Sequence, residues 1–141
     1  MTETERRQYV QKLHKGVIES AADAEDLLWN VVMAYQNHTF YTLLGLEFSY
    51  EVKRKRNGEY SGELLVSRKE TSKTLTRSSI MLAFRRVMEG IKTVKDEENT
   101  FLIVPEYRGP KAIGQIFGIS YIYSMFIEFE LIKKAEKAGK K

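Results

Sequence analysis

Residues 46–66, LEFSYEVKRKRNGEYSGELLV, decide the fold. Apolar side chains occupy every second position of the first half: Leu46, Phe48, Tyr50 and Val52. Successive side chains of a strand point to opposite faces, so this alternation predicts a strand with one buried face. Asn57-Gly58 follows and is the strongest short signal for a tight hairpin turn. Because Leu64 and Val66 continue the apolar pattern after the turn, we predict an antiparallel β-hairpin.

A long helix is predicted before the hairpin, over residues 2–37. Its apolar residues recur three and four positions apart: Val10, Leu13, Val17, Ala21, Ala24, Leu28, Val31 and Tyr35. This spacing places them on one face of a helix. Gly16 interrupts the pattern and marks either a bend or a boundary between two helices.

The rest of the chain is predicted to alternate between helices and short extended segments. In chain order these are a polar, basic loop over 67–77, a helix over 78–91, a solvated turn over 93–99, a strand over 101–104, a helix opening at Gly109-Pro110 and a last helix over 119–134. The order α-β-β-α-β-α-α, with a small antiparallel sheet covered by helices, defines an α+β protein. No linker divides the chain, so residues 1–141 are predicted to form a single domain that ends in a basic tail, 133–141.

The composition indicates the cellular compartment of the protein. The chain has no cysteine, which excludes disulfides and cysteine-ligated zinc and favours a reducing compartment. No apolar run reaches the roughly 18 residues of a membrane span, and the first residues are too polar for a signal peptide. We therefore expect a cytoplasmic protein without membrane contact. The net charge of +4 suits an anionic partner without demanding one.

The first candidate site is the basic, hydroxyl-rich stretch 67–79, which leads into a predicted helix. The free N–H groups at a helix N-terminus attract anions, and Arg, Lys and hydroxyl side chains donate hydrogen bonds to phosphate oxygens. The predicted phosphate ligands are Arg68, Lys69, Lys73, Thr76, Arg77 and Ser78. The alternative is an ordinary solvated loop with a helix cap.

The second candidate site is the stretch Tyr107-Arg108-Gly109-Pro110-Lys111, which also precedes a predicted helix. Arg108 and Lys111 would contact phosphate, Gly109 would allow close approach of the backbone, and Tyr107 is a possible accessory that could stack on a base. The stretch matches neither a Walker motif nor a dinucleotide fingerprint. The alternative is a turn that simply begins a helix.

The hairpin carries a third basic cluster, Lys53-Arg54-Lys55-Arg56. Arg54 and Arg56 could extend a phosphate-binding surface, because basic residues on a hairpin can contact a nucleic-acid backbone. They could equally protect a strand edge from aggregation.

The last predicted helix has almost no polar face between Ile119 and Ile132. A helix that is apolar all round is buried on all sides. It is therefore either the centre of the core or part of a subunit interface, and the second alternative predicts a homo-oligomer.

No catalytic motif is recognisable in the sequence. The two histidines, His14 and His38, have no partner at a spacing typical of catalysis or metal binding. We therefore predict a non-enzymatic protein with no cofactor and no metal that binds a phosphate-bearing ligand, with nucleic acid favoured. Two alternatives stay open. One is a homo-oligomer that binds or sequesters a small linear or cyclic nucleotide, and the other is a protein-interaction or inhibitor domain, by analogy with phage accessory proteins.

Overall fold

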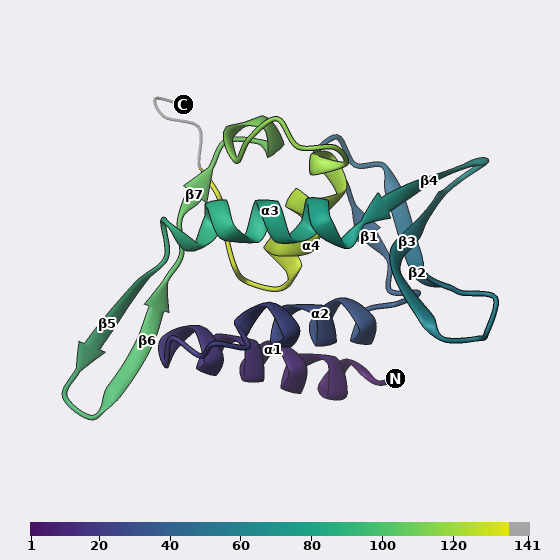
Figure 1. Ribbon diagram of the computed structural model, residues 1–141. Coiled ribbons are helices and arrows are strands. Elements are labelled where there is room, and N and C mark those ends of the chain that lie inside the picture. The colour runs from purple at the N-terminus through teal and green to yellow at the C-terminus, as the bar shows by residue number, and fades with distance from the viewer. Residues whose placement is uncertain (136–141) are drawn as a thin grey trace.

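The computed structural model describes residues 1–135, in which helices pack against an antiparallel sheet (Figure 1). The α-helices of this part of the chain are α1 (Glu3–Ile18), α2 (Ala24–Ala34), α3 (Arg77–Met88) and α4 (Ile119–Glu128). The main sheet contains, in spatial order, β1 (Phe40–Tyr41), β2 (Glu47–Arg54), β3 (Tyr60–Arg68) and β4 (Thr71–Thr76). The predicted α+β class is confirmed, and the order of elements broadly agrees with the prediction.

The predicted hairpin is present as β2 and β3. Tyr50 lies opposite Val66, and Val52 lies opposite Leu64, so the alternating apolar residues of the paired strands share the buried face. Leu46, which was predicted on the same face, precedes β2 and is 52% exposed. Gly58 adopts the left-handed conformation in the turn, with a φ of 88°.

The predicted basic loop over 67–77 is wrong, because most of it forms β4. This strand pairs with β3 around a tight turn at Lys69 and Glu70, with Arg68 opposite Thr71. Only Leu75 of β4 is buried, so the strand shows no apolar alternation. Its tendency to extend comes from threonines, whose branched side chains favour strands.

The segment predicted as helix over 2–37 forms two helices, α1 and α2, which lie side by side (Figure 1). A boundary between two helices was one of the two alternatives predicted at Gly16, but the boundary lies further along the chain. The break comes at Ser20, which is left-handed with a φ of 54°. Ser20 donates its backbone N–H to the carbonyl of Val17, and Ala21 donates to that of Gly16, which is a Schellman ending. Gly16 itself stays inside α1, where it makes room for Leu27 of α2.

The predicted solvated turn over 93–99 is also wrong. It belongs to a second hairpin, formed by β5 (Lys92–Asp96) and β6 (Asn99–Ile103) and joined by Glu97 and Glu98. The charged residues in β5 hide its strand character from the sequence pattern. The predicted strand over 101–104 overlaps the second half of this hairpin.

The helix predicted at Gly109-Pro110 is only a single 3-10 turn, η1 (Pro110–Ala112). The last helix ends at Glu128 rather than at 134, because Glu130 is left-handed and donates back to the carbonyl of Ile127. The chain then extends into β8 (Lys133–Lys134), which pairs in parallel with β7 (Glu106–Tyr107). The remainder of the predicted basic tail, 136–141, lies outside the described residues.

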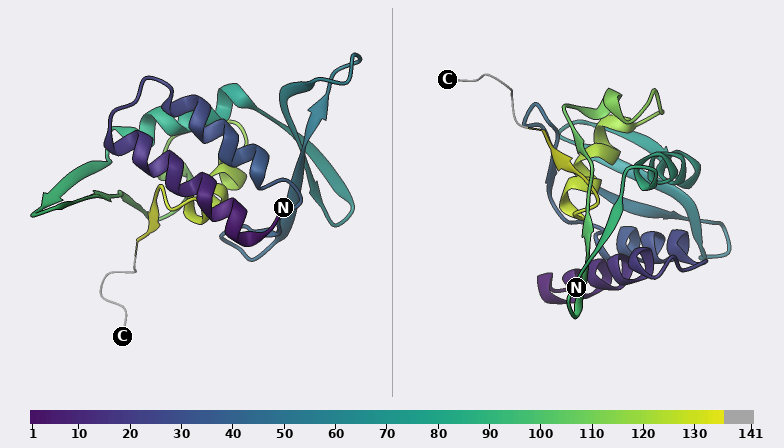
Figure 2. Two further views of the ribbon diagram at one scale, coloured as in Figure 1. Left: turned by 90° about the horizontal axis from the view of Figure 1, so that it is seen from below. Right: turned by 90° about the vertical axis from the view of Figure 1, so that its left-hand side faces the viewer.

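Helix α4 lies in the middle of the molecule (Figures 1 and 2). Its residues 119, 121–126 are all buried, against the sheet and the other helices. Burial within one chain accounts for the apolar character of this helix, so α4 gives no argument for a subunit interface. No helix among residues 1–135 is long and apolar enough to cross a membrane.

Candidate ligand-binding cleft

A cleft of about 610 Å³ opens between the β3–β4 hairpin, the loop before β2 and the start of α4. We call this hollow the cleft. Its apolar lining is contributed by three segments that are distant in sequence: Leu43, Leu44 and Leu46; Val66 and Leu75; Ile116, Phe117, Ile119 and Tyr121. Arg68 and Lys73 are its charged lining residues. The cleft therefore combines an apolar floor with a cationic rim.

The strand register places Arg68 and Lys73 on one face of the sheet. Lys73 lies opposite Val66, and residues opposite each other in antiparallel strands share a face. Arg68 is two positions beyond Val66 and so points the same way. This is the face whose other residues, such as Leu64, form the core. Arg68 and Lys73 thus lie on the core-facing side of the hairpin, just beyond the residues that are buried in the core.

The guanidinium of Arg68 is held beside an aromatic ring. Its carbon lies 5.9 Å from the centroid of the Tyr121 ring, at the limit of a cation–π contact, and Nη2 donates to Oγ1 of Thr71 at 3.4 Å. Arg68 has no carboxylate partner among the described residues. Its charge remains available to an anion in the cleft.

Two apolar side chains of the cleft are unusually exposed. Leu44 is 88% exposed and Phe117 is 72% exposed, and both belong to loops rather than to helices or strands. Exposed apolar side chains that line one cleft are typical of binding surfaces. No Asp or Glu in the described part of the chain lines the cleft.

The start of α4 forms one wall of the cleft. Gly118 is its N-cap and is left-handed, with a φ of 76°. The side chain of Leu75 lies where a Cβ of residue 118 would be. Glycine is therefore required here both by the backbone and by the close approach of β4 to α4.

In the structure, the first set of predicted phosphate ligands is distributed over several separate places. Arg68 and Lys73 line the cleft, whereas Lys69 lies at the turn of the hairpin in an adjoining hollow that also contains Glu70. Thr76 caps α3 by accepting a hydrogen bond from the N–H of Ser79 at 3.2 Å. Ser78 is exposed in the first turn of that helix.

Arg77 lies in a different, acidic hollow. Its Nη2 donates to Oδ1 of Asp26 at 3.1 Å, and its guanidinium lies 4.9 Å from the centroid of the Trp29 ring. Glu25 also lines this hollow and forms two hydrogen bonds with Arg85. The carboxylates here repel a phosphate, so Arg77 joins α3 to α2 instead.

The second predicted set adjoins the cleft. Arg108, Gly109 and Lys111 line a shallow hollow of about 450 Å³ that shares Pro110, Ile119 and Ser120 with the cleft. Because η1 has only three residues, the expected helix N-terminus is absent at this point. Arg108 and Lys111 nevertheless line a hollow that adjoins the one lined by Arg68 and Lys73.

Tyr107 is only partly buried, and its backbone carbonyl accepts a hydrogen bond from the hydroxyl of Tyr123 at 3.0 Å. Burial raises the pKa of the Tyr107 hydroxyl. The Tyr107 side chain packs against the core and lines neither the cleft nor the hollow beside it.

The accessory pair lies away from the cleft. Arg54 donates to the carbonyl of Gly58 and to the hydroxyl of Tyr60, both at 2.8 Å, and its guanidinium lies over the Tyr60 ring. Arg54 therefore stabilises the turn of the hairpin. Arg56 is exposed in that turn. Arg54 is eight residues after Leu46 along the strand, roughly 26 Å at the rise of an extended chain.

Sequence reasoning missed Leu44 and Phe117. The available signal was a short apolar run, Leu43-Leu44, in a segment without strand or helix periodicity. Such a run in a loop has no core to enter, and this makes it a candidate for a binding surface.

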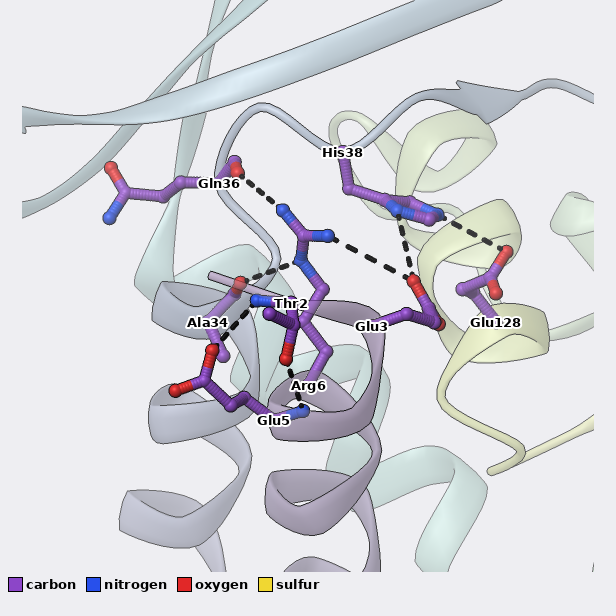
Figure 3. Close-up of polar contacts among 8 residues, drawn as sticks. All are labelled: Thr2, Glu3, Glu5, Arg6, Ala34, Gln36, His38 and Glu128. Carbon is purple, nitrogen blue, oxygen red and sulfur yellow. Dashed lines mark hydrogen bonds and ion pairs between the residues drawn. The ribbon is translucent and has the colours of Figure 1, made fainter.

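A second polar cluster lies at the other end of α4 and joins three helices (Figure 3). His38 has Nδ1 4.0 Å from Oε1 of Glu3 and Nε2 3.7 Å from Oε1 of Glu128. Arg6 donates from Nε to the carbonyl of Ala34 at 3.0 Å. These contacts link the start of α1 to the ends of α2 and α4. In residues 1–135 no group of three or more His, Cys, Asp or Glu side chains is arranged to hold a metal ion.

Comparison with known proteins finds no family model, no curated protein and no solved structure that matches the chain. The function is therefore argued from the cleft itself.

Proposed function

We propose that this protein binds a phosphate-bearing ligand in the cleft, without catalysing a reaction, and that the ligand is single-stranded nucleic acid. The observation that carries the proposal is the placement of Arg68 and Lys73 on the same face as the cleft's apolar floor. A nucleic acid presents the matching pair of features, an anionic backbone and flat, largely apolar bases.

The exposed ring of Phe117 favours a single strand over a duplex. Bases of a single strand are free to stack on an aromatic side chain, which contributes about 1–3 kcal/mol per base. In a duplex the bases are already stacked on each other. Arg68 and Lys73 would contact the backbone phosphates beside such a base.

The second pair of cations favours a ligand longer than one nucleotide. Arg108 and Lys111 line the hollow that shares Pro110 and Ser120 with the cleft, and no acidic residue of the described chain lines the cleft or this hollow. A strand that runs from the cleft into this hollow would reach both pairs of cations. Binding would then weaken steeply with added salt, because each neutralised phosphate releases counterions.

A small nucleotide is the second candidate ligand. The cleft volume of about 610 Å³ lies within the range of about 300–1,000 Å³ that is common for small-molecule sites. A nucleotide would place its base against Phe117 and its phosphate against Arg68. It would leave Arg108 and Lys111 without a role.

Fluorescence anisotropy with a labelled single strand of about 16 nucleotides tests the proposal. We expect Arg68→Gln/Lys73→Gln to weaken binding at least tenfold and to reduce the salt slope by about 1.4, which corresponds to two lost phosphate contacts. The matched control is Lys55→Gln/Arg56→Gln, which removes the same charge from the exposed hairpin turn.

Equal loss of affinity in both double variants would contradict the proposal, because it would indicate attraction by net charge alone. Competition by a mononucleotide as strong as by the oligonucleotide would favour the second candidate. Binding of a duplex as tight as that of a single strand would exclude the stacking role of Phe117.

A further inference from the structure

The β5–β6 hairpin, residues 92–103, projects from the body of the molecule past the ends of α1 and α2 (Figures 1 and 2). We call it the arm. Its base is fixed by Leu102, which packs against the core. A two-stranded hairpin alone is only marginally stable in water, so the rest of the arm lacks the support that a larger sheet would give.

One face of the arm carries three apolar side chains, of which Val94 is half-buried and Phe101 and Ile103 are exposed. Val94 lies opposite Phe101, and Lys92 lies opposite Ile103, so these side chains share a face. Phe101 is 45% exposed and Ile103 is 50% exposed. This face is opposite to the one that carries Leu102. The described residues of the same chain thus leave an apolar stripe open along the arm.

The tip of the arm is acidic. Asp96, Glu97 and Glu98 are consecutive, and the last two form the turn. Glu97 is left-handed, with a φ of 50°, in a position where Gly or Asn is usual. Gly or Asn at this position would make the turn more stable. Glu97 and Glu98 instead place carboxylates at the tip of the hairpin.

We propose that the arm of one copy of this chain docks in the cleft of a second copy. The arm offers an apolar stripe that ends in carboxylates, and the cleft offers exposed Leu44 and Phe117 beside Arg68 and Lys73. The two surfaces therefore complement each other in both apolar character and charge.

The arm and the β3–β4 hairpin lie at opposite ends of the molecule in Figure 1 and in the left view of Figure 2. An arm cannot reach the cleft of its own chain across that distance. Docking is consequently head-to-tail, and copies joined in this way form a ring or an open chain. The acidic tip also occupies the position proposed for phosphates, so self-association and nucleic-acid binding compete.

This inference depends on the shape and charge of the cleft, and it holds whether or not nucleic acid is its ligand. The test is sedimentation velocity of the full chain, without nucleic acid, over a concentration series. We expect the weight-average mass to rise at least twofold above the monomer mass of 16.4 kDa and to fall back in high salt.

Two charge-reversed variants make the test specific. In Glu97→Lys/Glu98→Lys both the arm and the cleft are basic, and in Arg68→Glu/Lys73→Glu both are acidic. Each variant alone should stay monomeric. An equimolar mixture should assemble, because each arm then meets a cleft of opposite charge.

Assembly of the mixture also shows that both variants are folded. A wild-type chain that remains monomeric at every concentration would overturn the proposal. Assembly of either variant alone to the wild-type extent, or a mixture that stays monomeric while the wild type assembles, would likewise overturn it.

Discussion

Gly118 at the start of α4 lies directly against the side chain of Leu75 in β4, with no room for a Cβ between them. This contact joins the sheet to the central helix at the floor of the cleft. Gly118 also has a φ of 76°, which side chains of L-residues rarely adopt. The backbone conformation and the packing thus both require glycine at position 118.

We expect Gly118→Ala to lower the free energy of unfolding by about 2–4 kcal/mol. About 1 kcal/mol comes from the left-handed backbone, and overpacking against Leu75 adds about 1–3 kcal/mol. Gly58→Ala is the control, because Gly58 has a φ of 88° but no atom near the position of a Cβ. Urea unfolding of both variants measures the difference, and equal losses would contradict the role of Leu75.

Tyr50 is expected to make stability sensitive to alkaline pH. Burial raises the pKa of its hydroxyl well above the ordinary value of about 10, and the hydroxyl donates to the carbonyl of Val32 at 2.7 Å. The unfolded chain therefore ionises first. The stabilisation is complete below pH 10 and falls above it by up to about 1.4 kcal/mol per pH unit, until the folded pKa is reached.

Tyr50→Phe should flatten this alkaline slope by up to one proton. At neutral pH the same variant should be less stable by about 1 kcal/mol, because Val32 loses its hydrogen bond. The control is Tyr41→Phe, which removes an exposed hydroxyl. Urea unfolding at pH 7 and near pH 11 gives both quantities. A slope unchanged in Tyr50→Phe would show that other groups cause the alkaline loss.

The parts of the fold that the sequence predicts are those encoded by neighbouring residues. The β2–β3 hairpin has alternation and a turn dipeptide within 46–66, and both are local. In contrast, β4 and β5 each contain a single large apolar residue, Leu75 and Val94, so neither shows the alternation of a half-buried strand. The end of α1 was hidden because Ser20, rather than glycine, takes the left-handed position.

The candidate site was predictable only in part for a related reason. Arg68 and Lys73 stand out in the sequence as cations, but their shared face follows from the pairing of β3 with β4. Leu44 reaches the cleft from the loop between β1 and β2, and Phe117 reaches it from the loop before α4. A site assembled from three distant segments has no signature in any one of them.

Thr76 was predicted to contact phosphate, and its place in the structure makes a capping role testable. Thr76→Ala should lower the free energy of unfolding by about 1 kcal/mol, because the N–H of Ser79 loses its acceptor. Thr76→Ser keeps the hydroxyl and should retain most of the stability. Neither variant should change the affinity for oligonucleotide. A loss of affinity in Thr76→Ala at unchanged stability would restore the original prediction.

Arg77 and Arg108 were both predicted phosphate ligands, and the structure now distinguishes them. Arg77 pairs with Asp26 and stacks on Trp29, whereas Arg108 adjoins the cleft. We expect Arg108→Gln to weaken oligonucleotide binding several-fold and to reduce the salt slope by about 0.7. Arg77→Gln should leave both unchanged, and should cost about 1 kcal/mol or less in stability because its contacts are exposed.

Each of these variants removes one positive charge, so the pair controls for net charge as well as for position. Anisotropy titrations over roughly 50–200 mM salt provide the slopes, and urea unfolding provides the stabilities. If Arg77→Gln reduced affinity as much as Arg108→Gln, then the ligand would extend over the hollow beside α2, in spite of Glu25 and Asp26. The binding surface would then extend beyond the cleft.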